Sequence, residues 1–224
     1  MIFELNTIPV SIGLCFVAVI LLATVGWLYS LWVDEVSIVA PLWPIMVLVC
    51  TLIFTNFSGA EGPLSLALQA MVTLWALRMA VFLLVRDHYR PEQRQYRLMR
   101  MELSSSFYRK SLPKIFYGHA LSAWIASVIF AILLFDIAAG NTQWAGFHTF
   151  AIGAFTVGLI IQSIADYQLP ALAAMCRRSV VPSRRVCGNT AVTRIILLSA
   201  LFGGHGVFLP FPQAIFWQLF HPYL

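Results

Sequence analysis

Five long apolar stretches constrain this chain more than any other feature of its sequence. Each contains 17 to 25 residues, at positions 8–32, 38–54, 64–85, 115–135 and 147–165. A helix needs about 20 apolar residues to cross the hydrocarbon core of a bilayer. Since 60% of the residues are hydrophobic and only 10% are charged, an ordinary soluble domain is excluded. The sequence predicts an all-α, polytopic transmembrane helix bundle.

A sixth apolar stretch, 195–220, is interrupted by three glycines and two prolines, which disfavour a regular helix. It is a sixth candidate span. Between the first two stretches Asp34 and Glu35 leave only a short turn, which predicts an antiparallel helical hairpin. In the first long connection, Pro91 and Glu92 form a helix-opening pattern, and Tyr96, Met99 and Leu103 recur three to four residues apart. We expect a short amphipathic helix there, lying on the cytoplasmic face against lipid headgroups.

The positive charges are concentrated in two connections. Of the 14 Lys and Arg residues, eight lie in 86–114 and five in 177–194, and only Arg78 lies within an apolar stretch. Basic connections remain on the cytoplasmic side, so the N-terminus is predicted outside and the connections 33–36, 86–114 and 170–194 inside. This pattern accounts for the basicity without a nucleic-acid partner, and it predicts attraction to anionic membrane lipid.

The cysteines and histidines do not form a metal-binding pattern. Cys15 and Cys50 fall in apolar stretches, while Cys176 and Cys187 lie in the second basic connection with ten residues between them, without a histidine partner. We expect no metal and assign all four cysteines structural or incidental roles.

A polar cluster closes the fifth apolar stretch. It contains Gln162, Ser163, Asp166, Tyr167 and Gln168. Polar groups at the end of a membrane span are unfavourable unless they face protein, water or a ligand, which makes this cluster a candidate functional site. The helix dipole disfavours a carboxylate at a C-terminus, so Asp166 needs compensation from arginines of the first basic connection or from ribose hydroxyls.

Arg78 is the one cation within an apolar stretch, eight residues before Arg86. At the helical rise it lies about 12 Å from the cytoplasmic end, a distance that a long side chain nearly spans. It therefore either snorkels to the surface or faces inward, toward a ligand or Asp166.

Four motifs together resemble the membrane steroid 5-alpha-reductase-like family, in its uncharacterised bacterial branch. They are W-A-L-R-M at 75–79, Arg86, E-Q-R-Q-Y at 92–96 and I-A-D-Y-Q-L at 164–169. In that branch the loop motif is E-D-x-R-Y, from which Gln93 and Gln95 depart. The resemblance implies a helix bundle that binds NADPH at its cytoplasmic side and reduces a carbon–carbon double bond conjugated to a carbonyl. It assigns the cofactor to Asp166, Gln162, Tyr167, Arg78, Arg86, Glu92 and Tyr96, and leaves the catalytic acid unassigned.

The family's most specific motif, G-L-R-x-Y-S-R-H-P-N-Y-F-x-E followed by W-W, is absent. The motif can be recovered by changing the reading frame. If suitable codons are chosen for residues 192–197 and each codon boundary is moved back by one base, the new codons encode H-P-N-Y-F. The same displacement converts 187–192 into L-R-K-Y-S-R and places W-W near Gly204. We interpret the chain as translated out of frame from between residues 170 and 186 to about residue 206, and resequencing the gene tests this interpretation.

The resemblance divides the chain into a helix bundle, 1–169, and a basic connection with an aberrant apolar tail, 170–224. It implies an integral protein of a bacterial inner membrane acting on a hydrophobic, steroid-like or lipid-like small molecule. A second interpretation is a membrane methyltransferase of the isoprenylcysteine type, which shares R-H-P-x-Y but uses S-adenosylmethionine. A third is a non-catalytic remnant, because half of a binding site has been replaced by the tail.

Overall fold

The computed structural model describes residues 2–88, 94–103, 107–140 and 146–178, and its regular structure there is entirely helical. Its helices form two compact units, the first ending at Trp144 and the second beginning at Ala145. The first unit contains α1 (Ile2–Val33), α2 (Val39–Ser58), α3 (Pro63–His88), α4 (Arg94–Leu103), α5 (Phe107–Ser111), the π-helical turn η2 (Leu112–Phe116) and α6 (Tyr117–Ala138). The second unit contains α7 (Gly146–Arg178).

Five segments are long and apolar enough to cross a membrane, as the sequence predicts. They are Thr7–Val33, Val39–Ser58, Pro63–Asp87, Phe107–Ala138 and His148–Gln168. The fourth combines α5, η2 and α6, and is therefore longer than the apolar stretch 115–135 indicates. The predicted sixth span lies outside the described residues.

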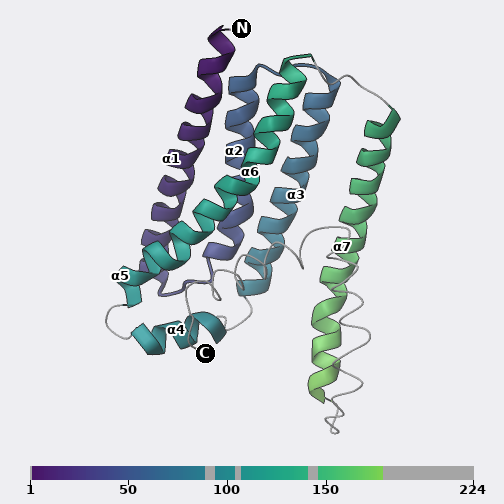
Figure 1. Ribbon diagram of the computed structural model, residues 1–224. Helices are drawn as coiled ribbons and strands as arrows, with labels where there is room; N and C mark the ends of the chain where they lie inside the picture. The colour runs from purple at the N-terminus through teal and green to yellow at the C-terminus, as the bar shows by residue number, and fades with distance from the viewer. Residues whose placement is uncertain (1, 89–93, 104–106, 141–145, 179–224) are drawn as a thin grey trace, which may run out of the picture. The chain divides into compact units, whose positions relative to one another are not determined.

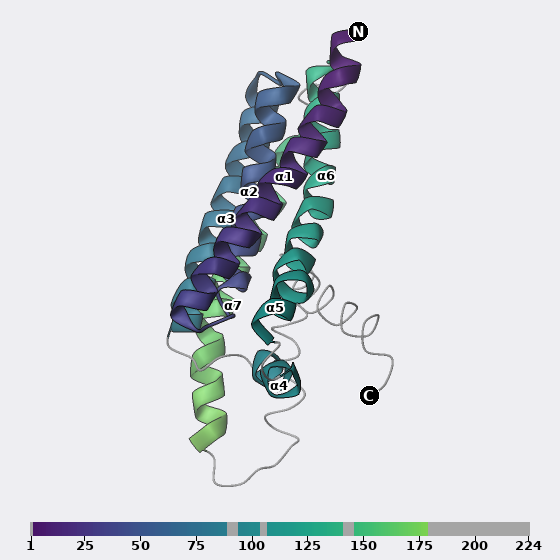
Figure 2. The ribbon, with the colours of Figure 1, turned by 90° about the vertical axis from the view of Figure 1, so that its left-hand side faces the viewer.

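Helix α2 is the centre of the first unit. It packs against α1, α3 and α6, while α1 also packs against α6 (Figures 1 and 2). Asp34 adopts a φ angle of 59° in the turn after α1, a left-handed conformation that aspartate tolerates better than most residues. This turn produces the predicted hairpin of α1 and α2.

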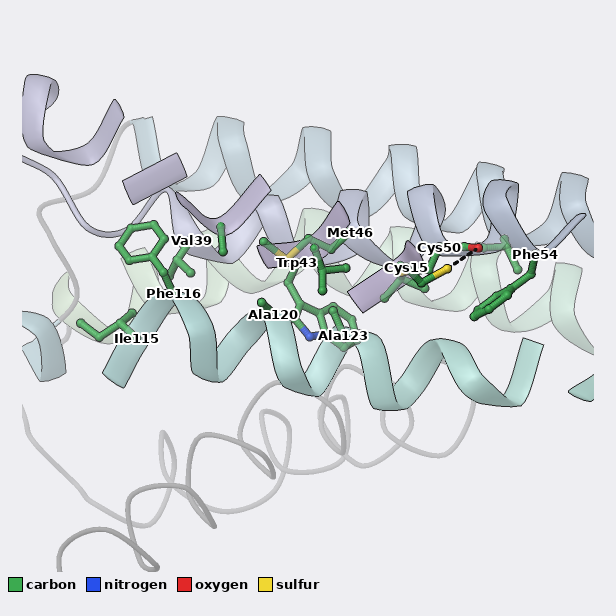
Figure 3. Close-up of a cluster of buried hydrophobic side chains, with 14 of the residues drawn as sticks. Cys15, Val39, Trp43, Met46, Cys50, Phe54, Ile115, Phe116, Ala120 and Ala123 are labelled. Carbon is green, nitrogen blue, oxygen red and sulfur yellow. Dashed lines mark hydrogen bonds between the residues drawn. The ribbon is translucent and has the colours of Figure 1, made fainter. Parts of the chain in front are cut away.

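The hydrophobic core lies between α1, α2 and α6. Trp43 and Met46 of α2 lie beside Ala120 and Ala123 of α6, and Phe54 lies farther along α2, near Cys50 (Figure 3). Small residues on one membrane helix allow the backbone of its neighbour to approach closely. The indole Nε1 of Trp43 also donates to Ser122 Oγ at 3.0 Å, which links α2 to α6.

The outer surface of this unit is apolar. Exposed side chains include Leu21 and Val25 on α1, and Ile129 and Ile132 on α6. Buried hydroxyls bond within their own helices: Thr51 Oγ1 donates to Val47 O at 2.9 Å, and Ser127 Oγ donates to Ala123 O at 2.7 Å. Internal pairing of polar groups beneath an apolar exterior is what a hydrocarbon environment requires.

The predicted amphipathic helix is present as α4, at the end of the unit opposite the N-terminus of α1 (Figures 1 and 2). Its apolar face meets protein: Tyr96 is 3% exposed and belongs to the hydrophobic core, and the partly buried Met99 packs against that core. Leu98 and Met101 are exposed. The helix is therefore docked on the bundle, an arrangement that its sequence period alone does not specify.

Helix α7 continues ten residues past Gln168, the last residue of its apolar span, and ends at Arg178. The boundary predicted between residues 169 and 170 thus falls inside a helix, which passes through Pro170. Of the predicted second basic connection, residues 170–178 are helical, and residues 179–194 lie outside the described part of the chain.

Candidate functional site

The predicted site residues fall in both units. Arg78 and Arg86 lie on α3 and Tyr96 on α4, whereas Gln162, Asp166 and Tyr167 lie on α7. Glu92 lies outside the described residues. Two local arrangements can be described, one on α7 and one in the first unit.

On α7, Gln162 and Asp166 lie one helical turn apart, on the same side of the helix. Gln162 is 1% exposed and Asp166 is half-buried, while Gly158 and Ala165 continue the buried side. A buried primary amide and a carboxylate can present donors and acceptors together. The sequence prediction that the two residues form one polar site is therefore compatible with the helix geometry.

Tyr167 is oriented differently. Its side chain is 86% exposed, and it lies about 100° around the helix from Asp166. Ser163 is also exposed, and its hydroxyl donates to Leu159 O at 2.7 Å within the same helix. On α7 the polar cluster thus separates into a buried Gln162 with a half-buried Asp166 on one side, and an exposed group on the other.

Arg78 and Arg86 lie about two turns apart on α3, both half-buried. Arg86 Nε donates to Asp87 Oδ1 at 2.7 Å and Arg86 Nη2 donates to Asp87 Oδ2 at 3.1 Å. This bidentate pair neutralises part of the positive charge of Arg86, which the family resemblance assigns to the cofactor.

A second polar arrangement, which the sequence did not predict, joins α4 and α5 to the turn after α1. Arg100 Nη1 donates to Asp34 Oδ1 at 2.8 Å, and Arg100 Nη2 donates to Asp34 O at 3.3 Å. Tyr108 OH donates to Asp34 Oδ1 at 2.5 Å. We call Asp34, Arg100 and Tyr108 the polar clamp.

The clamp is supported by aromatic neighbours. Trp27 Nε1 donates to the backbone oxygen of Tyr108 at 3.1 Å, and the Arg100 guanidinium lies 4.9 Å from the centre of the Phe107 ring. The hydroxyl of Tyr108 and, secondarily, the charge and hydrogen bond of Arg100 lower the pKa of Asp34. These contacts favour the charged carboxylate and hold α4 against the end of the bundle.

The clamp could be anticipated from the sequence only in part. Asp34 stood out as a charge in a very short turn, but Arg100 follows it by 66 residues and Tyr108 by 74. Nothing in local spacing pairs these residues. Within the described part of the chain no cluster of His, Cys, Asp or Glu could hold a metal ion.

Five apolar spans, of which those of the first unit enclose a hydrophobic core, define a polytopic helical membrane protein. The chain belongs to the family described as protein of unknown function (DUF1295), whose sequence model matches residues 26–181. The match contains the polar clamp and all the predicted cofactor residues. Comparisons with curated proteins and with solved structures found no match.

Proposed function

We propose that this chain is built on the plan of an NADPH-dependent membrane reductase that acts on conjugated carbon–carbon double bonds of steroid-like or lipid-like enones. One observation carries the proposal. The motif A-D-Y-Q-L, together with the preceding Gln162, puts a buried amide and a half-buried carboxylate one turn apart near the end of an apolar span. Such groups in a membrane helix are retained chiefly for function.

The chemistry of these two groups fits the ribose of a nucleotide. A carboxylate accepts hydrogen bonds from ribose hydroxyls, and acidic residues serve this purpose in other dinucleotide sites. A carboxylate repels phosphate, so the phosphates require cations. Arg78 and Arg86 are the candidates on α3, although Arg86 already shares its guanidinium with Asp87.

When bound, NADPH would supply a hydride to the substrate double bond. In this proposal Asp166 and Gln162 orient the ribose, and the arginines hold the phosphates. The apolar side chains of the spans exclude water and admit a hydrophobic substrate from the bilayer. Tyr96 supports α4 from within the core instead of presenting a fully accessible hydroxyl.

The proposal is tested by titrating the purified full chain in detergent with NADPH and measuring binding calorimetrically. Replacing Asp166 with Asn removes the charge and keeps the shape. The expected loss is about ten- to hundredfold in affinity, because a hydrogen bond to a charged group contributes roughly 1.5–3 kcal/mol. Thr156→Val is the matched control, since Thr156 is exposed on the same helix and its hydroxyl donates to Ile152 O at 2.8 Å. Equal affinities for Asp166→Asn and the parent would refute the assignment of Asp166.

Titration with S-adenosylmethionine separates the two remaining candidates. Binding of this ligand in place of NADPH would favour the methyltransferase, which is suggested by the R-H-P-x-Y sequence recovered in the displaced frame. Binding of neither would favour a non-catalytic remnant. The family match ends at residue 181, within the interval 170–186 where the change of frame is proposed to begin, which supports taking the remnant as a serious alternative.

A further inference from the structure

We propose that the exposed cations Arg109, Lys110 and Lys114, which we call the basic face, bind the headgroups of anionic phospholipids. The leaflet concerned is the one at the α4 end of the bundle. None of these three cations is among the proposed nucleotide residues. It rests on the orientation, depth and charge of the helical segment formed by α5 and η2.

The orientation of this segment follows from its buried side. Phe107, Ser111, Ile115 and Phe116 are buried, and the two phenylalanines and the isoleucine belong to the hydrophobic core. The three cations are all exposed. The segment therefore has one side fixed against the bundle and a positively charged side facing outward.

The depth of the basic face follows from the length of α6. Its 22 residues, Tyr117–Ala138, extend about 33 Å at the helical rise, which is enough to cross a hydrocarbon core of about 30 Å. With α6 occupying that core, Lys114 lies about 5 Å and Arg109 about 12 Å beyond it along the helix. Each headgroup region is roughly 5–8 Å thick, so Lys114 lies within the layer that contains lipid phosphates. Arg109 lies just outside that layer, and its long side chain can reach back to it.

The charge of the basic face is available to a partner. Among the described residues, none of its three cations forms an ion pair. Arg100, in contrast, is engaged by Asp34 in the polar clamp. Three unneutralised cations at headgroup depth are complementary to anionic lipid, and each contributes about a fivefold change in surface binding.

Exposed aromatic residues at the same end of the bundle fit this placement. Trp32 is 82% exposed near the end of α1, and its ring centre lies 6.0 Å from that of Tyr29. Trp27 connects this end of α1 to α5 through the backbone oxygen of Tyr108. Amphipathic aromatic rings are typical of the membrane–water interface.

The test measures lipid selectivity of the full chain. The protein is reconstituted in nanodiscs containing equal mole fractions of phosphatidylglycerol and phosphatidylcholine with the same acyl chains, and co-purified lipid is counted by native mass spectrometry. The parent protein is expected to be enriched at least fivefold in phosphatidylglycerol. The variant Arg109→Gln/Lys110→Gln/Lys114→Gln should lose most of that enrichment, because its outward-facing charge is gone.

The charge-preserving variant Arg109→Lys/Lys110→Arg/Lys114→Arg is the matched control and should retain the enrichment. Equal losses in the glutamine variant and in this control would overturn the proposal, as would equal binding of the two lipids by the parent. If the glutamine variant fails to fold, the parent protein is measured at 0.05 and 0.5 M salt instead. Because salt screens charge, the enrichment in phosphatidylglycerol should fall at 0.5 M, and an unchanged enrichment would overturn the proposal.

Discussion

Asp34 combines a left-handed backbone conformation with two side-chain partners from distant parts of the chain. Its carboxylate is 67% exposed, and the partner side chain of Arg100 is 28% exposed. Exposed ion pairs contribute little to global stability because water screens them. The clamp is therefore better understood as positioning α4 on the bundle than as holding the bundle together.

Neutralising Asp34 is expected to loosen α4. In Asp34→Asn, hydrogen exchange of the amides of Arg94–Leu103 at pH 7 should become about two- to fivefold faster, the scale of an exposed ion pair. Glu35→Gln changes a neighbouring acid outside the clamp and should leave this exchange unchanged. Similar rates in both variants would mean that α4 is held by Tyr96 and Met99 alone.

The lowered pKa of Asp34 gives the clamp a pH dependence of defined sign. A carboxyl group whose pKa is lower in the folded state stabilises the fold at pH values above its unfolded pKa, which is about 4. That contribution disappears as the pH falls below about 4. Between pH 5 and pH 3 the parent should therefore lose more thermal stability than Asp34→Asn, and equal losses would contradict this linkage.

Helices α1 and α2 approach each other closely at Gly26. An ideal Cβ on Gly26 of α1 would lie 2.5 Å from Leu42 Cδ2 on α2 and 3.7 Å from Phe116 Cε1. The same construction on Gly13 of α1 meets nothing within 4 Å. A side chain at Gly26 would therefore force Leu42 to move, whereas a side chain at Gly13 would displace nothing.

Gly26→Leu is expected to destabilise the bundle by about 1–3 kcal/mol, the usual range for overpacking a core. Gly13→Leu provides the matched control, with a change near zero because its side chain enters open space. Denaturant unfolding in mixed micelles, followed by tryptophan fluorescence, measures both. Equal effects would show that glycine flexibility, and not the approach of α2, accounts for the requirement at Gly26.

Helix α4 also shows which features of an element are local. Its helical character was predictable from the period of Tyr96, Met99 and Leu103. Its docking was not, since the same period suits a helix resting on lipid. The tyrosine that the family resemblance assigns to the cofactor is 3% exposed and belongs to the hydrophobic core of the first unit.

At the scale of the whole molecule, the basic connections predict the orientation in the membrane. Single cysteines at Glu61, exposed between α2 and α3, and at Lys110, exposed on α5, report opposite ends of the first unit. Cys176 and Cys187 are replaced by serine, while the buried Cys15 and Cys50 remain. A membrane-impermeant maleimide applied to intact cells should label Glu61→Cys and not Lys110→Cys.

Labelling of Lys110→Cys alone would reverse the predicted orientation, and labelling of both would exclude a single one. Detergent-permeabilised cells supply the control, because both cysteines should then react. Because Lys110 belongs to the basic face, the labelling result also identifies the membrane leaflet whose headgroups the basic face would contact.

The sequence by itself determined the number and approximate positions of the five spans within the described chain, the hairpin of α1 and α2, and the helical nature of α4. Those features depend on apolar length, short turns and residue period, all of which are local. Only the tertiary structure decided that Asp34 meets Arg100 and Tyr108, that Tyr96 enters the core and that α7 continues past Pro170. The clamp and the burial of Tyr96 depend on which helix faces meet across 60 residues or more, and a periodic pattern does not encode that choice.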